Sequence, residues 1–401
     1  MKTKKRLAII CGILYPDPSP TGMCAKRFAD LLADEYDIDI ICISTNGICE
    51  MIDYADGIRV HTLSGGMTAA EARSRGLIAK SAHLIGCLQI KMQLLGNLTW
   101  FKSAAHKKLT VLHSEYGLDA VFSICSPFSA HCAAKVFCDD FPTVHWCGYT
   151  VDPYTTQNRI RPFWCSYKRL AEKERRILSA MDSVLLSEEV FDNRKELYKG
   201  CQSCNALPYI LPKRVNIENT YRFFDKKEIN CVYAGSFYRD LRNPEAMLKA
   251  FADIKDSPIK LHLFCSGCED IVSKYAAVSD NIIIHGRVSV EEISQVYSEA
   301  DILVSIGNAV SEFLPSKTYE YIAAGKPVIN FYYASPDKVF QKYPICLQLP
   351  NSSDAQNEKK LQSFITLHNK EILDEKTVAD IYNQNSAEYA SKILHDNMLQ
   401  N

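Results

Sequence analysis

The chain has 401 residues, more than one ordinary hydrophobic core accommodates, and two domains are the expected number. Hydrophobic residues make up 47% and charged residues 23%, which are globular values that exclude a disordered chain and a bundle of membrane helices. Lys and Arg total 46 against 47 Asp and Glu, so no broad positive field attracts nucleic acid, and nucleic acid is not expected as a partner.

The first residues, MKTKKRLAIICGILYPDP, combine a basic start with a short apolar run, as a signal peptide does. The run ends in a Pro-rich loop without a small-residue cleavage site, so a first β-strand over residues 7–14 is the better prediction. Many of the sixteen cysteines lie within apolar runs, which is typical of buried, reduced thiols. These features predict a cytoplasmic protein.

The N-terminal half alternates strand-like and helical segments. A helix is expected over 23–35, and a strand-like run over 38–44 follows at the distance typical of a βαβ unit. Further strand-like runs lie at 120–125, 143–147 and 183–187. Because strands separated by helices form parallel sheets, we expect a doubly wound α/β domain over residues 1–206.

A long helical stretch over 69–112 carries scattered lysines at Lys80, Lys91, Lys102, Lys107 and Lys108. These charges interrupt every window long enough to span a bilayer, so no transmembrane helix is predicted there. Two interpretations stay open. One is a pair of helices on the sheet with lysines toward solvent. The other is a basic amphipathic face that makes peripheral contact with an anionic membrane.

Residues 207–227 lack periodicity and are predicted to link two domains. After them, strand-like runs at 230–234, 259–264, 281–285, 301–306 and 327–332 alternate with helices that begin near Asn243, Glu269, Val290 and Ser316. This pattern predicts a second doubly wound sheet over 207–385, and a last helix in 386–401 is expected to pack back on the first domain. Two such sheets predict an active site in the cleft between them, beyond the carboxyl ends of the strands.

The most informative stretch is residues 301–330, DILVSIGNAVSEFLPSKTYEYIAAGKPVIN. A buried strand runs into a loop, and Ser316 is placed to cap the helix that follows. The open amides of Ser316, Lys317 and Thr318 form an anion site, and Lys317 adds a positive charge for a phosphate. One turn further, Glu320 can accept hydrogen bonds from two ribose hydroxyls. One helical turn is therefore predicted to recognise a diphosphate and a ribose.

The segment PSKTYEYIAAGKPV within this stretch resembles the nucleotide-sugar signature of glycosyltransferase family 4 and its relatives, the group 1 glycosyl transferases. The resemblance covers most of the C-terminal half. It implies a GT-B fold, in which two Rossmann-like domains face a cleft. It also implies a nucleotide-diphosphate sugar as donor substrate on the C-terminal domain, with no separate cofactor. A glycan or lipid-linked acceptor on the N-terminal domain, a retaining reaction and a role in cell-surface polysaccharide biosynthesis are further expectations.

In the longer form of the signature, two glutamates lie eight residues apart, the first near the donor sugar. Glu312 and Glu320 have that spacing, so the resemblance makes Glu312 a catalytic candidate beside the ribose-binding Glu320. Phe313 stands where that form has a glycine, and Pro315 comes early. A solvent-exposed loop carboxylate is the alternative for Glu312.

A second resemblance lies in CVYAGSFYRDLRNPEAMLKAF, residues 231–251, where Gly235 ends the first strand of the second sheet as it does in the family. The family usually has an Arg and a Lys just beyond, which neutralise the diphosphate. Ser236 stands in place of that Arg, so Arg239 or Arg242 is expected to supply the charge, because a guanidinium can hold two phosphate oxygens. Solvated arginines at a helix start are the alternative.

On the N-terminal side, YPDPSPTGMCAKRFADLLADE resembles the loop and first helix of the family's acceptor domain. Gly22 would let the backbone approach the donor, although an ordinary helix-start turn explains a glycine there too. The segment VHWCGYTVDPYTTQNR resembles the loop that faces the cleft. Asp152 within it is a candidate to accept the proton of an acceptor hydroxyl, and a structural Asp-Pro turn is the alternative.

No metal is expected, because fixed positive charges can stabilise a leaving diphosphate without a cation. No DxD motif lies in a suitable loop, since Asp37 and Asp39 fall inside an apparent strand. Two CxxC pairs could form a zinc site, which their wide separation disfavours: Cys201 with Cys204 and Cys265 with Cys268.

Three rival functions remain. A GT-B nucleotide-sugar epimerase would use the same nucleotide site with additional acids. A non-catalytic nucleotide-sugar-binding subunit of a polysaccharide assembly complex would bind the donor without turnover. A dinucleotide oxidoreductase needs a GxGxxG motif after the first strand, which the sequence after Gly12 does not provide.

Overall fold

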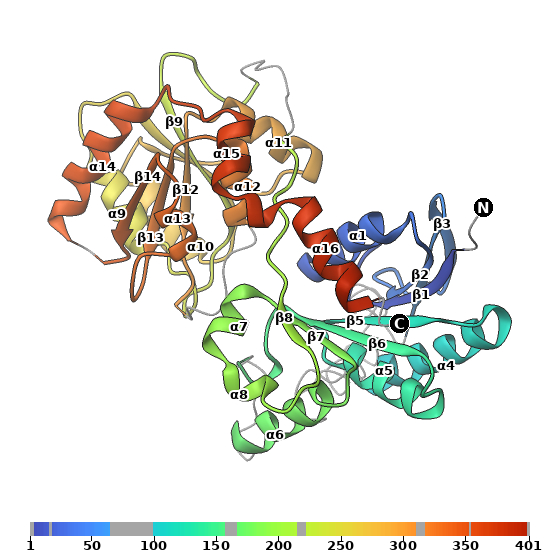
Figure 1. Cartoon of the computed structure of the whole chain (residues 1–401). Coiled ribbons are helices and arrows are strands. Elements are labelled where there is room, and N and C mark those ends of the chain that lie inside the picture. Colours follow the sequence, from blue (N-terminus) through green and yellow to red (C-terminus); the bar gives the residue numbers. More distant parts are fainter. Residues whose placement is uncertain are drawn as a thin grey trace, which may run out of the picture. The chain divides into compact units, whose positions relative to one another are not determined.

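The computed structural model describes residues 4–15, 18–64, 99–156, 167–214, 222–309, 317–352 and 354–398. The chain divides into two compact units. Unit 1 comprises Met1–Tyr209 with Ala387–Asn401, and unit 2 comprises Ile210–Ser386 (Figure 1). The sequence places the corresponding boundaries at 206/207 and 385/386.

Unit 1 contains one eight-stranded sheet. Its strands are β1 (Lys5–Ile10), β2 (Tyr36–Ile43), β3 (Met51–Ala55), β4 (Ile58–Leu63), β5 (Ala120–Cys125), β6 (His145–Thr150), β7 (Ser183–Leu186) and β8 (Cys204–Ala206). They lie in the order β3-β4-β2-β1-β5-β6-β7-β8. Every neighbouring pair is parallel except β3, which runs antiparallel to β4 at the edge. The predicted parallel α/β sheet is therefore confirmed, with one antiparallel hairpin that the sequence did not reveal.

The described helices of unit 1 connect these strands. They are α1 (Pro20–Leu32), α4 (Thr99–Tyr116), α5 (Ser129–Asp140), α6 (Tyr167–Leu178), α7 (Glu188–Asn193), α8 (Lys195–Tyr198) and α16 (Ala387–Met398), with a short 3₁₀ turn η1 (Tyr154–Thr156). α1 begins three residues before the start expected at 23, because Ser19 caps it by accepting a hydrogen bond from the backbone amide of Gly22 at 3.2 Å and Pro20 occupies the first turn.

The last helix, α16, belongs to unit 1 and packs against α1 and β6. His145 on β6 hydrogen-bonds the carbonyl of Asn397 at 2.7 Å, and the hydroxyl of Tyr36 donates to the carbonyl of Met398 at 3.4 Å. Both carbonyls lie in the last turn of α16, where helical carbonyls have no partner within the helix. Side chains of the sheet thus cap the end of the chain's last helix.

Of the helical stretch expected over 69–112, the structure describes the part in α4, which carries Lys102, Lys107 and Lys108. Lys80 and Lys91 lie outside the described residues. Within the portion of the chain that the structure describes, no helix has the length and apolar character needed to cross a bilayer. The two interpretations of this stretch therefore both stay predictions.

Several strand boundaries differ from the sequence-based ones, most clearly those of β1 and β6. The first strand was expected over 7–14, but β1 ends at Ile10. The apolar residues after it pack beneath α1, where the carbonyl of Ile13 accepts hydrogen bonds from the amide and the hydroxyl of Ser19, each at 2.9 Å. Likewise β6 extends to Thr150 rather than ending at 147. Apolar sequence alone does not distinguish a strand from a buried loop.

Unit 2 contains a six-stranded sheet in which all neighbours are parallel. Its strands are β9 (Ile229–Ser236), β10 (Ile259–Ser266), β11 (Ile282–Ile284), β12 (Ile302–Ile306), β13 (Val328–Tyr332) and β14 (Cys346–Pro350). The order is β11-β10-β9-β12-β13-β14, so the winding direction reverses between β9 and β12. The second doubly wound sheet is therefore confirmed, and its switch point, where ligands bind in such sheets, lies at β9 and β12.

The helices of unit 2 lie on both faces of this sheet (Figure 1). They are α9 (Glu245–Ala252), α10 (Glu269–Ala276), α11 (Val290–Glu299), α12 (Lys317–Ala324), α13 (Lys338–Gln341), α14 (Ala355–His368) and α15 (Glu375–Ile381), with a 3₁₀ turn η3 (Asn383–Asn385). α12 ends at Ala324 because Gly325 adopts a φ of 71°, which a glycine reaches without steric cost. Arg214 donates from Nε to the carbonyl of Ala323 at 2.9 Å and so caps the helix end.

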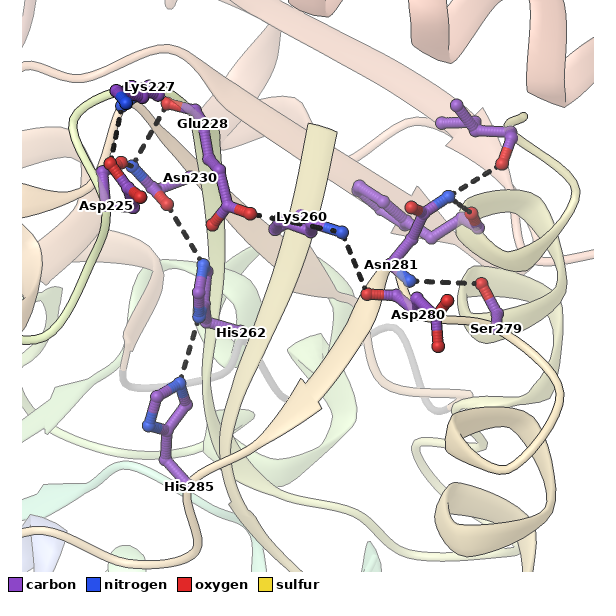
Figure 2. Close-up of polar contacts among 12 residues, drawn as sticks. Asp225, Lys227, Glu228, Asn230, Lys260, His262, Ser279, Asp280, Asn281 and His285 are labelled. Atoms are coloured by element: carbon purple, nitrogen blue, oxygen red, sulfur yellow. Dashed lines mark hydrogen bonds and ion pairs between the residues drawn. The ribbon is translucent and has the colours of Figure 1, made fainter. Parts of the chain in front are cut away.

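A chain of polar side chains crosses three strands of unit 2 (Figure 2). The side-chain nitrogen Nδ2 of Asn230 donates to the backbone carbonyl of Asp225 at 3.1 Å. This leaves Oδ1 of Asn230 as an acceptor for Nε2 of His262 at 3.0 Å. Nδ1 of His262 then accepts from Nε2 of His285 at 2.9 Å. Burial lowers the pKa of His262 to about 3, so its ring is neutral and this bonding pattern is fixed. The chain holds His285 directly after β11, with its ring stacked on Phe264 at 4.4 Å between centroids.

Candidate functional site

The carboxyl ends of β9 and β12 separate at the switch point of unit 2. β12 pairs with β9 as far as Val304 and Tyr233. At the next residue, Ala234, the hydroxyl of Tyr321 on α12 replaces the strand: it accepts from the amide of Ala234 at 3.0 Å and donates to its carbonyl at 3.3 Å. A side chain therefore satisfies the backbone that the departing strand leaves open, and it fixes α12 beside the end of β9.

The loop after β9 folds back on itself. Tyr238 and Arg242 exchange two backbone hydrogen bonds, at 3.1 and 2.7 Å. The carbonyl of Leu241 also accepts from the amide of Ala309, in the loop after β12, at 2.8 Å. These bonds return Arg242 to the strand ends and join the two loops of the switch point.

Arg242 has neutral partners. Nε and Nη2 donate to Oδ1 of Asn308 at 3.1 and 2.8 Å, and Nη1 donates to the carbonyl of Ser236 at 3.3 Å. Among the residues that the structure describes, no carboxylate pairs with it. Its half-buried positive charge is therefore held in place by dipoles, and it stays available for an anion.

Arg239, the other arginine of this loop, lies in a different environment. Its side chain is 59% exposed, and Nη2 contacts Oδ2 of Asp270 on α10 at 2.7 Å. The sequence left Arg239 and Arg242 as equal candidates for a diphosphate contact. The structure distinguishes them, because Arg239 already has a counterion and Arg242 has none among the described residues.

Helix α12 carries the predicted phosphate and ribose residues, in its described part. Nζ of Lys317 donates to Oε2 of Glu320 at 2.8 Å, and the hydroxyl of Tyr297 on α11 donates to the same oxygen at 3.3 Å. The hydroxyl of Thr318 is buried and forms no hydrogen bond within the described part of the chain. Ser316 and Glu312 lie outside the described residues.

The two candidate glycines differ in what surrounds them. A Cβ at Gly22 would lie 2.0 Å from the carbonyl oxygen of Ile13, so close packing of α1 on the loop after β1 requires glycine there. A Cβ at Gly235 would meet nothing nearer than the hydroxyl of Tyr233, at 3.4 Å. The structural alternative therefore accounts for Gly22. A side chain at position 235, near the end of β9, would make only ordinary van der Waals contacts, so packing against the described residues does not require a glycine there.

Asp152 follows β6 in unit 1. Burial raises the pKa of its carboxyl group to about 6, and that group forms no hydrogen bond to a described residue. The loop beyond it is held by Glu174 on α6, which accepts hydrogen bonds from the amides of Tyr154 and Thr155 at 2.6 and 3.0 Å. The carboxyl of Asp152 can therefore take up or release a proton near neutral pH, as a general base must.

Sequence reasoning did not single out Glu189 or Tyr297. Glu189 follows β7 in the first turn of α7, and burial raises its pKa to about 7, with smaller contributions from the charges of Glu188, Asp192 and Asp152. Its position just after a predicted strand was the available signal. Tyr297 is identifiable only from the structure, because α11 and α12 must pack together before its hydroxyl reaches Glu320.

The metal candidates are placed as follows. Cys201 and Cys204 lie in unit 1, whereas Cys265 and Cys268 lie in unit 2. Within the described ranges, no group of three or more His, Cys, Asp or Glu side chains could hold a metal ion. Asp39 on β2 is buried, and it contacts Arg59 and His61 at 2.7 Å each, so it belongs to a buried ion cluster of the sheet.

Comparison with known proteins identifies the fold. Residues 228–353 match the family model described as Glycosyl transferases group 1. No curated protein sequence matches the chain. Solved structures match it over nearly its whole length. A sucrose-phosphate synthase from Thermosynechococcus elongatus is 16% identical, with a TM-score of 0.70 and 98% of each chain covered.

Two further structures were determined with ligands. A UDP-forming α,α-trehalose-phosphate synthase from Burkholderia xenovorans, in complex with glucose-6-phosphate, is 9% identical with a TM-score of 0.64, over 98% of this chain and 100% of that one. A protein from Anabaena in complex with UDP-glucose is also 9% identical, with a TM-score of 0.54, over 98% of this chain and 95% of that one. At these identities the likeness shows the fold. The predicted GT-B fold and the resemblance to group 1 glycosyl transferases are confirmed.

Proposed function

We propose that this chain, which has the GT-B fold and a group 1 glycosyl transferase segment, transfers a sugar from a nucleotide-diphosphate sugar to a glycan or lipid-linked acceptor. The observation that carries the proposal is the position of Arg242, which lies without a counterion among the described residues, where β9 and β12 separate. Lys317 and Glu320 lie on α12, which Tyr321 fixes beside the same strand end. In this proposal unit 2 binds the donor and unit 1 binds the acceptor.

The proposed chemistry follows from these charges. Cleavage of the bond between sugar and phosphate leaves negative charge on the diphosphate, and stabilising that charge is the largest catalytic task. Arg242 and Lys317 would stabilise it at a half-buried position, where charges are screened less than in water. We propose that these fixed cations make a metal ion unnecessary. Glu320 would accept the ribose hydroxyls, and Gly235 would leave room for the diphosphate beside β9.

Asp152 is the proposed base for the acceptor hydroxyl. With a pKa of about 6, its carboxyl is largely ionised at neutral pH and is a stronger base than an ordinary aspartate. Glu189 would supply a second carboxyl of near-neutral pKa at the neighbouring strand end. Retention of the anomeric configuration, a role in polysaccharide biosynthesis, a cytoplasmic location and peripheral membrane contact through 69–112 complete the proposal.

A thermal-shift screen against UDP-, GDP-, ADP- and dTDP-sugars tests the donor site. We expect one nucleotide class to raise the unfolding temperature. Glu320→Ala and Lys317→Ala should each weaken binding of that donor by about 1–3 kcal/mol, because each variant loses a charged hydrogen bond. The matched control is Lys338→Ala, an exposed lysine at the start of α13. Donor affinity at the wild-type level in both site variants would remove the assignment.

Turnover separates transfer from the two alternatives that share this site. A transferase should release nucleoside diphosphate faster when its acceptor is present. An epimerase would convert the donor into its epimer without any acceptor, which NMR of the sugar protons detects. A non-catalytic binding subunit would show the thermal shift but no product with any acceptor in a panel of glycans, sugar phosphates and lipid-linked sugars.

A further inference from the structure

We propose that the ion pair between Lys317 and Glu320 makes the donor site selective for ligands that carry a ribose and a diphosphate together. Lys317 occupies the carboxylate of Glu320, which a ribose needs, and Glu320 occupies the ammonium group of Lys317, which a diphosphate needs. A nucleoside alone, or pyrophosphate alone, must break the ion pair, and it then provides a new partner for only one of the two charges. This inference rests on the proposed function and specifies how that same site discriminates among ligands.

Each member of the pair has a partner within the protein. Lys317 and Glu320 are one helical turn apart, and Nζ contacts Oε2 at 2.8 Å. The hydroxyl of Tyr297 donates to the same Oε2, and its ring lies 5.6 Å from the lysine nitrogen. Lys317 therefore has a carboxylate and an aromatic ring as neighbours, and one oxygen of Glu320 already accepts two hydrogen bonds.

Both side chains are partly withdrawn from water, with 31% of Lys317 and 28% of Glu320 exposed. A ribose diol that binds the carboxylate through both oxygens must displace Lys317 from Oε2. The displaced ammonium then loses its counterion in a half-buried place, which costs free energy. A diphosphate that withdraws Lys317 leaves Glu320 in the same state. When both halves arrive on one ligand, each charge gains a new partner and neither cost remains.

Two substitutions separate this mechanism from independent binding groups. Lys317→Met keeps the length of the side chain and releases Glu320, so nucleosides should bind about 2- to 5-fold more tightly, as expected for removal of a partly exposed ion pair. The same change should weaken nucleoside diphosphates about 10-fold or more, because a charged phosphate contact is lost. Glu320→Gln releases Lys317, so inorganic pyrophosphate should bind about 2- to 5-fold more tightly while nucleosides bind more weakly.

The experiment measures dissociation constants for UDP, GDP and ADP, for uridine, guanosine and adenosine, and for inorganic pyrophosphate. Saturation-transfer NMR titration covers the weak ligands, and calorimetry covers the tight ones. Lys338→Met is the matched control, because this exposed lysine on α13 should leave every constant unchanged. Equal unfolding temperatures of variants and wild type confirm that the variants are folded.

The outcomes are distinct. Opposite changes in the affinity for the two half-ligands, tighter nucleoside with Lys317→Met and tighter pyrophosphate with Glu320→Gln, support the inference. Half-ligand affinities that stay constant or fall in both variants overturn it, even if the diphosphates still bind the wild type and the proposed function stands. Absence of binding by all three diphosphates to the wild type, together with no thermal shift from any of the four nucleotide-sugar classes, contradicts the proposed donor site itself, and the inference fails with it.

Discussion

Both units present the carboxyl ends of parallel strands, but the polar side chains at these two edges have different hydrogen-bond partners. In unit 1 the polar side chains bond to the unit's own backbone: Thr21 donates to the carbonyl of Ser126 at 2.9 Å, and Glu174 accepts two amides of the η1 turn. In unit 2, Arg242 is held by neutral acceptors alone. Burial at the first edge raises the pKa of the Asp152 carboxyl to about 6, whereas the second edge keeps a fixed positive charge. A fold used twice in one chain can thus present a proton acceptor on one edge and an anion site on the other.

The largest expected difference between the two units is in the free energy of unfolding when Gly22 in unit 1 and Gly235 in unit 2 are each replaced by alanine. Gly22→Ala should destabilise unit 1 by about 2–4 kcal/mol, because the new methyl group would overlap the carbonyl of Ile13 and backbone must move. Gly235→Ala should leave the free energy of unfolding within about 0.5 kcal/mol, because its methyl group meets only ordinary contacts. Urea unfolding of both variants measures these values.

The same pair separates a packing glycine from a ligand glycine. Gly235→Ala should lower affinity for the donor nucleotide while the fold stays intact. If Gly22→Ala unfolds at the wild-type urea concentration, the packing explanation for this residue is wrong, and its predicted role in donor approach becomes the better one.

Substitution of the two arginines tests the unit 2 edge directly. Arg242→Met should weaken binding of the preferred nucleoside diphosphate by about 1.5–3 kcal/mol, because a half-buried charged hydrogen bond to phosphate is lost. Arg239→Met should leave the affinity near that of wild type, because this exposed side chain is already paired with Asp270. Calorimetry at low and moderate salt makes the comparison. A larger loss from Arg239→Met would reverse the assignment.

The fold was predictable where strands are buried on both faces, because such strands form continuous apolar runs. β5 and β12, which are buried throughout, were found. β3, β8 and β14 were not, because β3 is alternately exposed, β8 has no buried position and β14 has a single buried residue. β4, which is largely buried, was missed as well. Apolar runs therefore located most strands in the middle of each sheet and missed three of the four edge strands, β3, β8 and β14.

Those parts of the site that lie within one segment of the sequence could be predicted. The turn from Lys317 to Glu320 could be identified because both residues lie in one motif. The choice between Arg239 and Arg242 could not be made, because it depends on Asp270 and Asn308, which lie far along the chain. The raised pKa of Asp152 likewise results from burial by distant elements.

The buried carboxyl of Asp152 predicts how stability depends on pH. Its pKa rises from about 3.8 in the unfolded chain to about 6 in the fold, so the folded state prefers the protonated form. Its contribution to stability is present below pH 4 and is lost as the pH rises through 6. Asp152→Asn should therefore exceed wild-type stability by about 1–2 kcal/mol at pH 8 and match it near pH 4.

Urea unfolding at both pH values measures the difference between Asp152→Asn and the wild type. Asp56→Asn, an exposed turn residue of the β3–β4 hairpin, is the control and should show none of this dependence. A stability gain that is equal at both pH values would mean that the charge of Asp152 is not what the fold disfavours.

The smallest expected effect concerns Tyr297, whose hydroxyl donates a hydrogen bond to Glu320. Tyr297→Phe keeps the ring that packs edge-on against Tyr321 and removes only the hydroxyl that orients Glu320. We expect nucleoside diphosphate affinity to fall by about 0.5–1 kcal/mol, the net contribution of one hydrogen bond. Tyr116→Phe, which removes an exposed hydroxyl in unit 1, is the control. Because this variant leaves the charge of the site unchanged, a loss as large as that of Arg242→Met would show that orientation of Glu320, rather than positive charge at the strand ends, governs recognition in unit 2.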